Sequence, residues 1–159
     1  MRRPEAKDVK RLVFVCHGNI CRSAYADVLA RKFGASASSF GLSTSTGKPA
    51  HPPIAAIADA RHLDLHGHLT TAVEDYQPQP GDYLLAMEVR HLRKIAANPA
   101  LRAIPRGLLG SYGRVPVPHL HDPYKLNPAY AEVCITRIEG AVAGLIKTYP
   151  SAIVSGSNR

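Results

Sequence analysis

Apolar and polar residues alternate in blocks along the chain, and these blocks predict strands and helices in turn. Four short apolar runs have the length and composition of strands. They are Arg11–Val15, Ser38–Thr44, Asp82–Met87 and Arg106–Leu109. Four longer segments carry apolar residues at helical spacing. They are Ala24–Phe33, Pro53–His62, Glu88–Ala97 and Asn127–Tyr149. This alternation predicts right-handed βαβ units, and therefore an α/β fold of three layers in which helices flank a parallel sheet.

Two of the predicted helices have an apolar face that should pack on the sheet. In the first helix the face consists of Tyr25, Val28, Leu29 and Phe33. In the last helix it consists of Tyr130, Val133, Cys134, Ile138, Ala141, Val142, Leu145 and Ile146. A chain of 159 residues suits one domain, which we expect at 11–150. The basic segment 1–10 is expected to be a flexible extension, and 151–159 a tail.

The charge and the cysteine count limit the partners and the compartment. The formal net charge is +8 at pH 7, so anionic partners are considered first. Nucleic acid is not expected, because no aromatic-rich basic strand or recognition-helix pattern accompanies the basic N-terminal segment. No apolar run is long enough to cross a bilayer, so no membrane association is expected. Three cysteines are too few for a secreted disulfide framework, and we expect a cytoplasmic protein.

The histidines and cysteines do not predict a metal site. Cys16, His17 and Cys21 lie close together in the sequence, but no second pair of cysteines or histidines completes a zinc site. His119 and His121 are candidate ligands, for which a surface or core position is the favoured interpretation. We therefore expect no metal and no cofactor.

The segment between the first strand and the first helix carries the strongest chemical signal. It reads Cys16-His17-Gly18-Asn19-Ile20-Cys21-Arg22-Ser23. A loop of this length before a helix N-terminus can turn successive N–H groups toward a phosphate. Arg22 at its end can hold two phosphate oxygens with its planar fork. Cys16 at its start would lie beneath the phosphorus, where the same groups stabilise its reactive thiolate.

A plainer interpretation is that Cys16 is a buried cysteine at a strand end and Arg22 a surface arginine. A cysteine followed by an arginine six residues later is weak evidence alone. Gly18 and Asn19, which tolerate left-handed backbone, and Ser23 at the helix start make the phosphate-binding interpretation much stronger. We therefore favour a nucleophilic cysteine in a phosphate-binding loop.

The loop resembles the signature of the low-molecular-weight protein tyrosine phosphatases, which is a cysteine, five residues and then Arg-Ser. Segments elsewhere resemble the family too, over roughly residues 12–149. They are Gly47-Lys48-Pro49 with Pro52, Leu65 with Gly67-His68, Asp82–Met87 with Glu88, His91-Leu92, and His121-Asp122-Pro123-Tyr124. The resemblance implies a four-stranded parallel sheet, and it is strongest to bacterial members that serve tyrosine kinases of capsule and exopolysaccharide export.

The same resemblance assigns roles to residues outside the thiol and the arginine. Asp122 is implied as the general acid that protonates the departing tyrosine oxygen, and Tyr124 as an aromatic wall for the substrate ring. Asn19 is implied to shape the loop in a left-handed conformation, with Ser23 and His68 in support. Cys21 either packs under the loop or, as the resemblance implies, forms a protective disulfide with Cys16. Cys134 lies on the apolar face of the last predicted helix and is expected in the core. The implied substrate is a phosphotyrosine protein such as an autophosphorylating tyrosine kinase, and the product is inorganic phosphate.

The chain departs from the family pattern at three places, and rival functions remain to be weighed. Ala24 replaces a proline, 43–46 (Ser-Thr-Ser-Thr) lack an aromatic of the cleft wall, and Lys125 replaces a second tyrosine.

An arsenate reductase would need two further relay cysteines on a mobile segment. Here only Cys21 and Cys134 remain, and Cys134 lies on a predicted core helix. An arginine phosphatase has threonine where Ile20 stands, and Ile20 favours an aromatic substrate. A non-catalytic phosphotyrosine-binding module would not need nucleophile, clamp and acid together.

Overall fold

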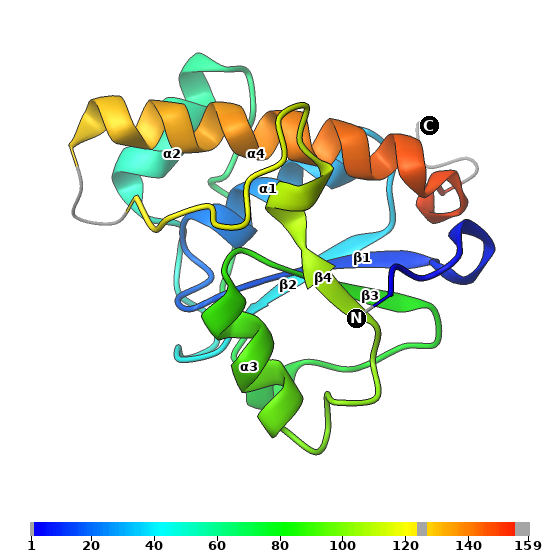
Figure 1. The fold of residues 1–159 in the computed structure, drawn as a ribbon. Coiled ribbons are helices and arrows are strands. Elements are labelled where there is room, and N and C mark those ends of the chain that lie inside the picture. The colour runs from blue at the N-terminus through cyan, green and yellow to red at the C-terminus, as the bar shows by residue number, and fades with distance from the viewer. Residues whose placement is uncertain (1, 124–126, 155–159) are drawn as a thin grey trace.

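An open parallel sheet with helices on both faces forms the centre of the molecule (Figure 1). The computed structural model describes residues 2–123 and 127–154. Its strands pair in the order β2-β1-β3-β4, and all three pairings are parallel. The strands are β1 (Arg11–Cys16), β2 (Ala37–Gly41), β3 (Asp82–Ala86) and β4 (Arg106–Leu108). The predicted three-layer α/β class with four parallel strands is confirmed.

The helices divide unequally between the two faces of the sheet. They are α1 (Arg22–Lys32), α2 (Pro52–Ala60), α3 (Val89–Ala97) and α4 (Pro128–Thr148). Helices α1, α2 and α4 lie on one face, and α3 covers the other (Figure 1). The described chain also contains four short 3-10 helices: η1 (Ala6–Asp8), η2 (Val73–Asp75), η3 (Leu109–Tyr112) and η4 (Pro150–Ala152). No helix in the described parts of the chain is long and apolar enough to span a membrane.

The residues of β1 alternate between the two halves of the core. Leu12, Phe14 and Cys16 belong to the larger apolar cluster under α1 and α4, whereas Val13 and Val15 belong to the smaller cluster under α3. This alternation is the period-two pattern of a strand covered on both faces. Cys16, the last residue of β1, therefore faces the side of the sheet that α1 and α4 cover.

Two predicted core positions are wrong. Phe33 is the C-cap residue of α1, and its side chain is 49% exposed. Because the helix ends at Lys32, Phe33 does not continue the apolar face that packs on the sheet. Val133 is 45% exposed, and its neighbour Ile135 is fully buried instead. The buried stripe of α4 therefore runs through Cys134 and Ile135 rather than through Val133, since the helix lies rotated from the face assumed.

Helix α4 approaches η3 closely at one glycine. A Cβ atom on Gly144 would lie 2.1 Å from the backbone oxygen of Tyr112, which is far inside van der Waals contact. Gly140, one turn earlier on the same helix, has nothing within 4 Å of such an atom. The absent side chain at Gly144 thus sets how closely α4 packs against the segment that follows β4.

The two ends of the described chain meet at the edge of the sheet opposite the carboxyl ends of the strands. The Tyr149 hydroxyl donates to the Pro4 carbonyl over 3.1 Å, and Ser151 Oγ donates to the Val9 carbonyl over 2.7 Å. Ser36 N–H donates to the Ala152 carbonyl over 2.8 Å. We expected a flexible extension before residue 11 and a tail after residue 150; in the structure, residues from both segments contact each other.

Candidate active site

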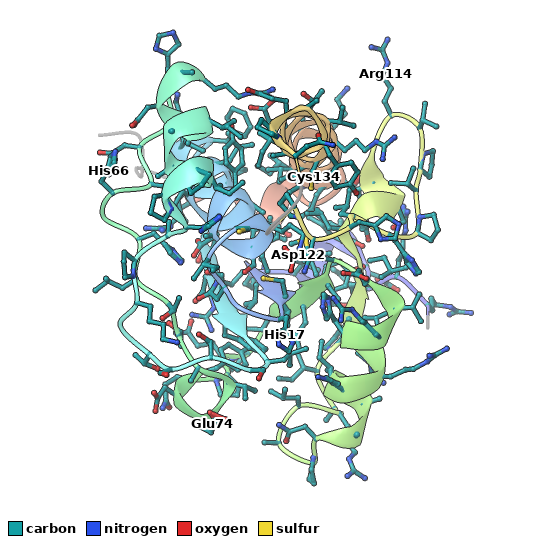
Figure 2. The ribbon with its side chains drawn as sticks, turned by 90° about the vertical axis from the view of Figure 1, so that its left-hand side faces the viewer. His17, His66, Glu74, Arg114, Asp122 and Cys134 are labelled. Atoms are coloured by element: carbon teal, nitrogen blue, oxygen red, sulfur yellow. The ribbon has the colours of Figure 1, made fainter. Side chains whose placement is uncertain are left out.

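The segment between β1 and α1 lies at the carboxyl ends of the parallel strands, where α/β proteins bind their ligands. His17 in this segment and Asp122 line the same small cavity, although they are far apart in the sequence (Figure 2). The cavity has a volume of about 140 Å³. Pockets for drug-sized molecules are typically about 300–1,000 Å³, so this one suits a small group such as a phosphate. It is lined by Cys16, His17, Gly18, Asn19, Ile20, Cys21, Arg22 and Asp122.

Asn19 holds the loop in a conformation that ordinary residues avoid. Its φ is 58°, in the left-handed region that asparagine tolerates better than most residues. Its side chain is fully buried, donates from Nδ2 to Ser23 Oγ over 2.8 Å, and accepts at Oδ1 from the Thr71 N–H over 2.9 Å. His68 Nε2 donates to the Asn19 carbonyl over 2.8 Å. Burial lowers the pKa of His68, although this hydrogen bond opposes the shift, so the ring is held neutral.

Most carbonyl groups of the loop are bound by the surrounding protein. The Cys16 and His17 carbonyls accept from the N–H groups of Leu42 and Ser43, both over 2.9 Å. The Ile20 carbonyl accepts from the His51 N–H over 2.9 Å. With its carbonyl side occupied in this way, the loop presents its N–H side to the cavity, which is the arrangement of an anion-binding loop.

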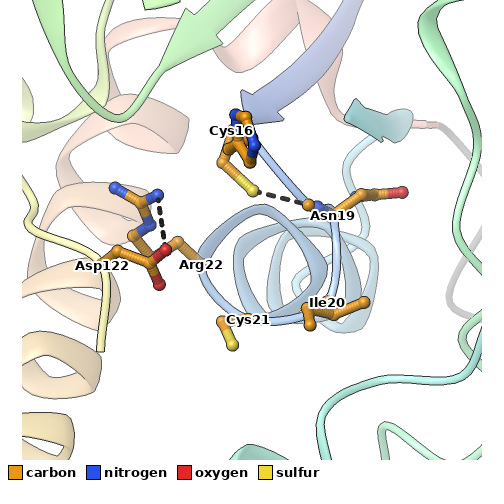
Figure 3. Close-up of a pocket in the computed structure, with 8 residues that line it drawn as sticks. Cys16, Asn19, Ile20, Cys21, Arg22 and Asp122 are labelled. Atoms are coloured by element: carbon orange, nitrogen blue, oxygen red, sulfur yellow. Dashed lines mark hydrogen bonds and ion pairs between the residues drawn. The ribbon is translucent and has the colours of Figure 1, made fainter. Parts of the chain in front are cut away.

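Cys16 Sγ receives hydrogen-bond donors from two directions. The Asn19 N–H donates to it over 3.2 Å (Figure 3), and the Ser23 hydroxyl lies 2.9 Å away. Because Asn19 Nδ2 already donates to Ser23 Oγ, the Ser23 hydroxyl can give its own proton to the sulfur. Donors aimed at the sulfur stabilise negative charge on it, which is the state in which a cysteine acts as nucleophile.

Arg22 is the first residue of α1 and is 1% exposed. Its Nη1 donates to Glu88 Oε2 over 2.5 Å and to the Leu120 carbonyl over 2.7 Å, and Nη2 lies 3.6 Å from Asp122 Oδ2. Its Nε has no hydrogen-bond partner among the described residues, although it is buried. A buried donor without a partner is costly. An oxyanion in the cavity that Arg22 lines would provide the missing acceptor.

Glu88, which caps the N-terminus of α3 two residues after β3, is a functional residue whose role the sequence did not reveal. Burial by itself would raise its pKa, but hydrogen bonds and charges from Arg90 and Arg22 outweigh burial and lower the pKa to about 2. The carboxylate is therefore ionised across the working pH range and fixes the guanidinium of Arg22. The available signal was a glutamate between a predicted buried strand and the helix that follows it.

His91 is a second buried group beside Glu88. It is 1% exposed, and neither ring nitrogen has a hydrogen-bond partner within the described residues. Burial, followed by the positive charge of Arg22, lowers its pKa to about 4. The ring is thus neutral and adds no charge to the phosphate-binding side.

The remaining predicted site residues fall into three groups. Ser23 and His68 contact Asn19, and Asp122 reaches Arg22, as described above. Cys21 lines the cavity wall, but its sulfur points away from Cys16 in Figure 3, and both thiols are free. Burial raises the pKa of Cys21, and the charges of Asp122 and Cys16 raise it further. Tyr124 and Lys125 lie outside the described residues.

A nucleophilic cysteine inside an anion-binding loop, an arginine clamp and a carboxylate on the rim define a cysteine-dependent phosphatase site on a parallel α/β sheet. Residues 11–152 match the family model described as "Low molecular weight phosphotyrosine protein phosphatase". The chain therefore belongs to the low molecular weight protein tyrosine phosphatase family, as the resemblance of its loop predicted.

Relatives and solved structures agree with this assignment. The low molecular weight protein-tyrosine-phosphatase Wzb of Salmonella typhi is 31% identical over 134 residues, which cover 81% of this chain and 87% of that protein. The probable phosphatase EpsP of Ralstonia solanacearum is 26% identical, over 84% and 92% of the two chains. The crystal structure of the Erwinia amylovora tyrosine phosphatase amsI superposes with a TM-score of 0.77 at 24% identity, over 89% and 93%. That structural likeness supports the fold.

Proposed function

We propose that this protein removes phosphate from phosphotyrosine in proteins through a covalent phosphocysteine intermediate on Cys16. The observation that carries the proposal is the environment of the cavity. Cys16 Sγ faces donors from Asn19 and Ser23, and the same cavity is lined by Arg22, whose buried Nε has no hydrogen-bond partner among the residues that the structure describes. Such a site binds a tetrahedral dianion and presents a thiolate to its phosphorus.

The first chemical step is phosphoryl transfer to sulfur. The Cys16 thiolate attacks phosphorus opposite the tyrosine oxygen, so the S–P bond forms as the P–O bond breaks. Arg22 and the loop N–H groups hold the three remaining phosphate oxygens, on which the charge spreads in the transition state. Asp122 gives its proton to the departing tyrosine oxygen.

The second step restores the enzyme. The Asp122 carboxylate takes a proton from a water molecule whose oxygen attacks the phosphorus, the S–P bond breaks, and inorganic phosphate leaves. The Ser23 hydroxyl, 2.9 Å from Cys16 Sγ, stabilises the thiolate as it departs. Asp122 is then protonated again, so atoms and charge balance over the cycle.

The substrate class follows from the composition of the cavity. Ile20 adds apolar bulk to its lining, which favours an aromatic ring over a guanidinium. We infer that the physiological substrate is an autophosphorylating bacterial tyrosine kinase involved in exopolysaccharide production, because the chain resembles the bacterial members of the family that serve such kinases, and its matched relatives Wzb and EpsP are bacterial phosphatases. A reducing cytoplasm suits this site, since Cys16 and Cys21 share one loop and an oxidising compartment would consume the thiolate.

Arginine phosphatase is the competing activity on this fold. Two solved structures of YwlE arginine phosphatase, one of them from Geobacillus stearothermophilus, superpose with a TM-score of 0.72 at 22% and 19% identity, a likeness that shows the fold alone. A direct comparison of phosphotyrosine and phosphoarginine peptides of the same sequence separates the two activities. Faster turnover of phosphoarginine would overturn the substrate assignment and leave the cysteine chemistry intact.

Trapping the intermediate tests the chemistry itself. Rapid quenching in denaturant during turnover should yield a phosphate bound covalently to the peptide that contains Cys16. Cys16→Ser should bind a phosphotyrosine peptide but lose at least 1,000-fold in turnover, an order of magnitude expected for loss of a nucleophile. Cys134→Ser is the matched control, because this buried cysteine on α4 donates to the His121 carbonyl over 3.4 Å and does not line the cavity, so the variant should keep its activity. Substantial turnover by Cys16→Ser would contradict the proposal.

A further inference from the structure

Three metal-ligating side chains lie together beside the phosphate-binding loop. Glu88, His119 and His121 each offer one donor atom, and these atoms all lie within 4.8 Å of one another. The two histidines come from the segment that leads to Asp122, and their rings meet edge to face with centroids 5.6 Å apart. Glu88 is the N-cap residue of α3, two residues after the end of β3. The fold thus joins two distant segments into one donor set that the phosphatase chemistry does not use.

We propose that Glu88, His119 and His121 form a binding site for Zn²⁺, and that occupancy of this site slows the phosphatase. Two imidazoles and one carboxylate are a donor set that zinc binds with three protein ligands and one open position. Magnesium and calcium prefer oxygen ligands and would not be selected. In tetrahedral zinc sites the donor atoms stand roughly 3.3 Å apart, so the side chains need only small movements to close on the ion.

The charges around Glu88 decide whether a cation can enter. Arg22 donates to Oε2 over 2.5 Å, whereas Oε1 accepts only from Arg90 Nε, over 3.2 Å, among the described residues. The Arg90 side chain is 55% exposed and can swing into solvent. Because a carboxylate has about four lone-pair sites, Oε1 can bind zinc after Arg90 leaves while Oε2 keeps Arg22. Arg90 is therefore the competitor of the metal.

Zinc at this site would act on the catalytic machinery through short covalent and hydrogen-bonded links. Leu120, between the two histidines, accepts from Arg22 Nη1 at its carbonyl and donates from its N–H to the Met87 carbonyl over 2.9 Å. Asp122 directly follows His121. A metal that ties His119 and His121 to Glu88 restrains the segment that must bring Asp122 to the leaving oxygen. Slower turnover follows from that restraint.

A second cluster provides a matched control. Asp59, Asp64 and His66 also place their donor atoms within 4.8 Å of one another, but all three residues are exposed and only one is an imidazole. His66 already contacts Asp59 Oδ2 at 3.0 Å. Replacing His66 removes one imidazole from the protein without touching the proposed site.

The binding experiment uses the full-length chain in a Cys16→Ser background, so that the catalytic thiolate cannot bind the metal. Calorimetric titration with ZnCl₂ should show one tight equivalent, and MgCl₂ should show none. The double variant His119→Gln/His121→Gln should weaken the zinc affinity at least 100-fold, and His66→Gln should leave it unchanged. Arg90→Gln should tighten binding several-fold, an effect that general loss of structure cannot produce.

The activity experiment uses the enzyme with Cys16 intact. Zinc should inhibit turnover of an aryl phosphate reversibly, with EDTA restoring the rate, and the double histidine variant should need at least tenfold more zinc for the same inhibition. Unchanged zinc affinity in His119→Gln/His121→Gln would overturn the site. A loss of zinc affinity in His66→Gln larger than that in the double variant would overturn it as well. Full binding without any inhibition would overturn the regulatory role. None of these outcomes depends on whether the natural substrate is phosphotyrosine.

Discussion

Asp122 is the residue whose role depends most on the third dimension. In the sequence it belongs to a proline-bounded loop, and only the fold brings it to the rim of the cavity beside Arg22. A general acid matters most when the leaving oxygen needs a proton, as that of tyrosine does. Its importance should therefore vary with the leaving group.

We predict that Asp122→Asn slows hydrolysis of a phosphotyrosine peptide by about 100-fold or more, the usual scale for losing general acid catalysis. The same variant should lose much less activity toward dinitrophenyl phosphate, whose oxygen departs without a proton. Steady-state kinetics with both substrates measure the difference. Glu74→Gln serves as control, because this exposed acid does not line the cavity. Equal losses with both substrates would assign Asp122 a structural role.

At the residue scale, the sequence predicted the groups that carry recognisable chemistry but not those that position them. Cys16, Arg22 and the left-handed Asn19 stand in a short contiguous motif, so their proximity required no tertiary information. Glu88 and the Leu120 carbonyl hold Arg22 from segments far along the chain. A backbone carbonyl has no identity in a sequence, and a glutamate after a strand has many equivalents.

Helix α4 illustrates what a single element adds. Its two glycines look alike in the sequence, yet Gly144 lies against the Tyr112 backbone and Gly140 faces open space. A methyl group added at Gly144 must push α4 away from η3. A methyl group added at Gly140 meets no neighbour and only raises the helix propensity. The pair therefore separates packing from propensity within one helix.

We expect Gly144→Ala to lower the free energy of unfolding by about 1–3 kcal/mol, the usual cost of overpacking. Gly140→Ala should raise it by about 0.8–1 kcal/mol, the difference in helix propensity between the two residues. Urea denaturation followed by circular dichroism measures both. A stabilised Gly144→Ala would mean that α4 can shift without cost.

Element boundaries were less predictable than element types. All four strands and four helices exist, but α1 begins at Arg22 rather than Ala24, because the phosphate-binding loop turns directly into the helix. The exposed Phe33 and Val133 show the same limit. Helical spacing defines a stripe of apolar residues, and the position of the neighbouring helices decides which edge of that stripe is buried.

Across the whole molecule, the sheet is fastened by a buried charge at the start of β3. Asp82 accepts from Arg11 Nε over 2.7 Å and Nη2 over 2.8 Å, from the Gln79 N–H over 3.0 Å, and from the Tyr76 hydroxyl. Burial would raise the pKa of Asp82, but the hydrogen bonds from Arg11, Tyr76 and Gln79 outweigh it and lower the pKa below its usual 3.8. The interaction links β1, β3 and the loop before β3.

A carboxylate with a lowered folded-state pKa stabilises the protein above its unfolded-state pKa and loses that contribution as the pH falls. Asp82→Asn should therefore lower the free energy of unfolding at pH 7 by about 3 kcal/mol, as expected when one partner of a buried pair is removed. The deficit should shrink as the pH falls below about 3.8. Denaturation at pH 7 and near pH 3 measures it, with the exposed Asp64→Asn as control. A deficit that is constant with pH would show that ionisation of Asp82 is unimportant.

The contact between the two ends of the chain has a consequence for biosynthesis. Cys16 leaves the ribosome early, but Leu120, Asp122 and α4, which complete its surroundings, leave late. Residues 149–152 then close the molecule against residues 4–9 and Ser36. The nascent chain therefore carries its nucleophile during the synthesis of more than a hundred residues, from Cys16 to Asp122, without the groups that make it a catalyst. We therefore expect phosphatase activity only after α4 has emerged and packed against the sheet, so that a nascent chain that still lacks α4 does not act on substrates.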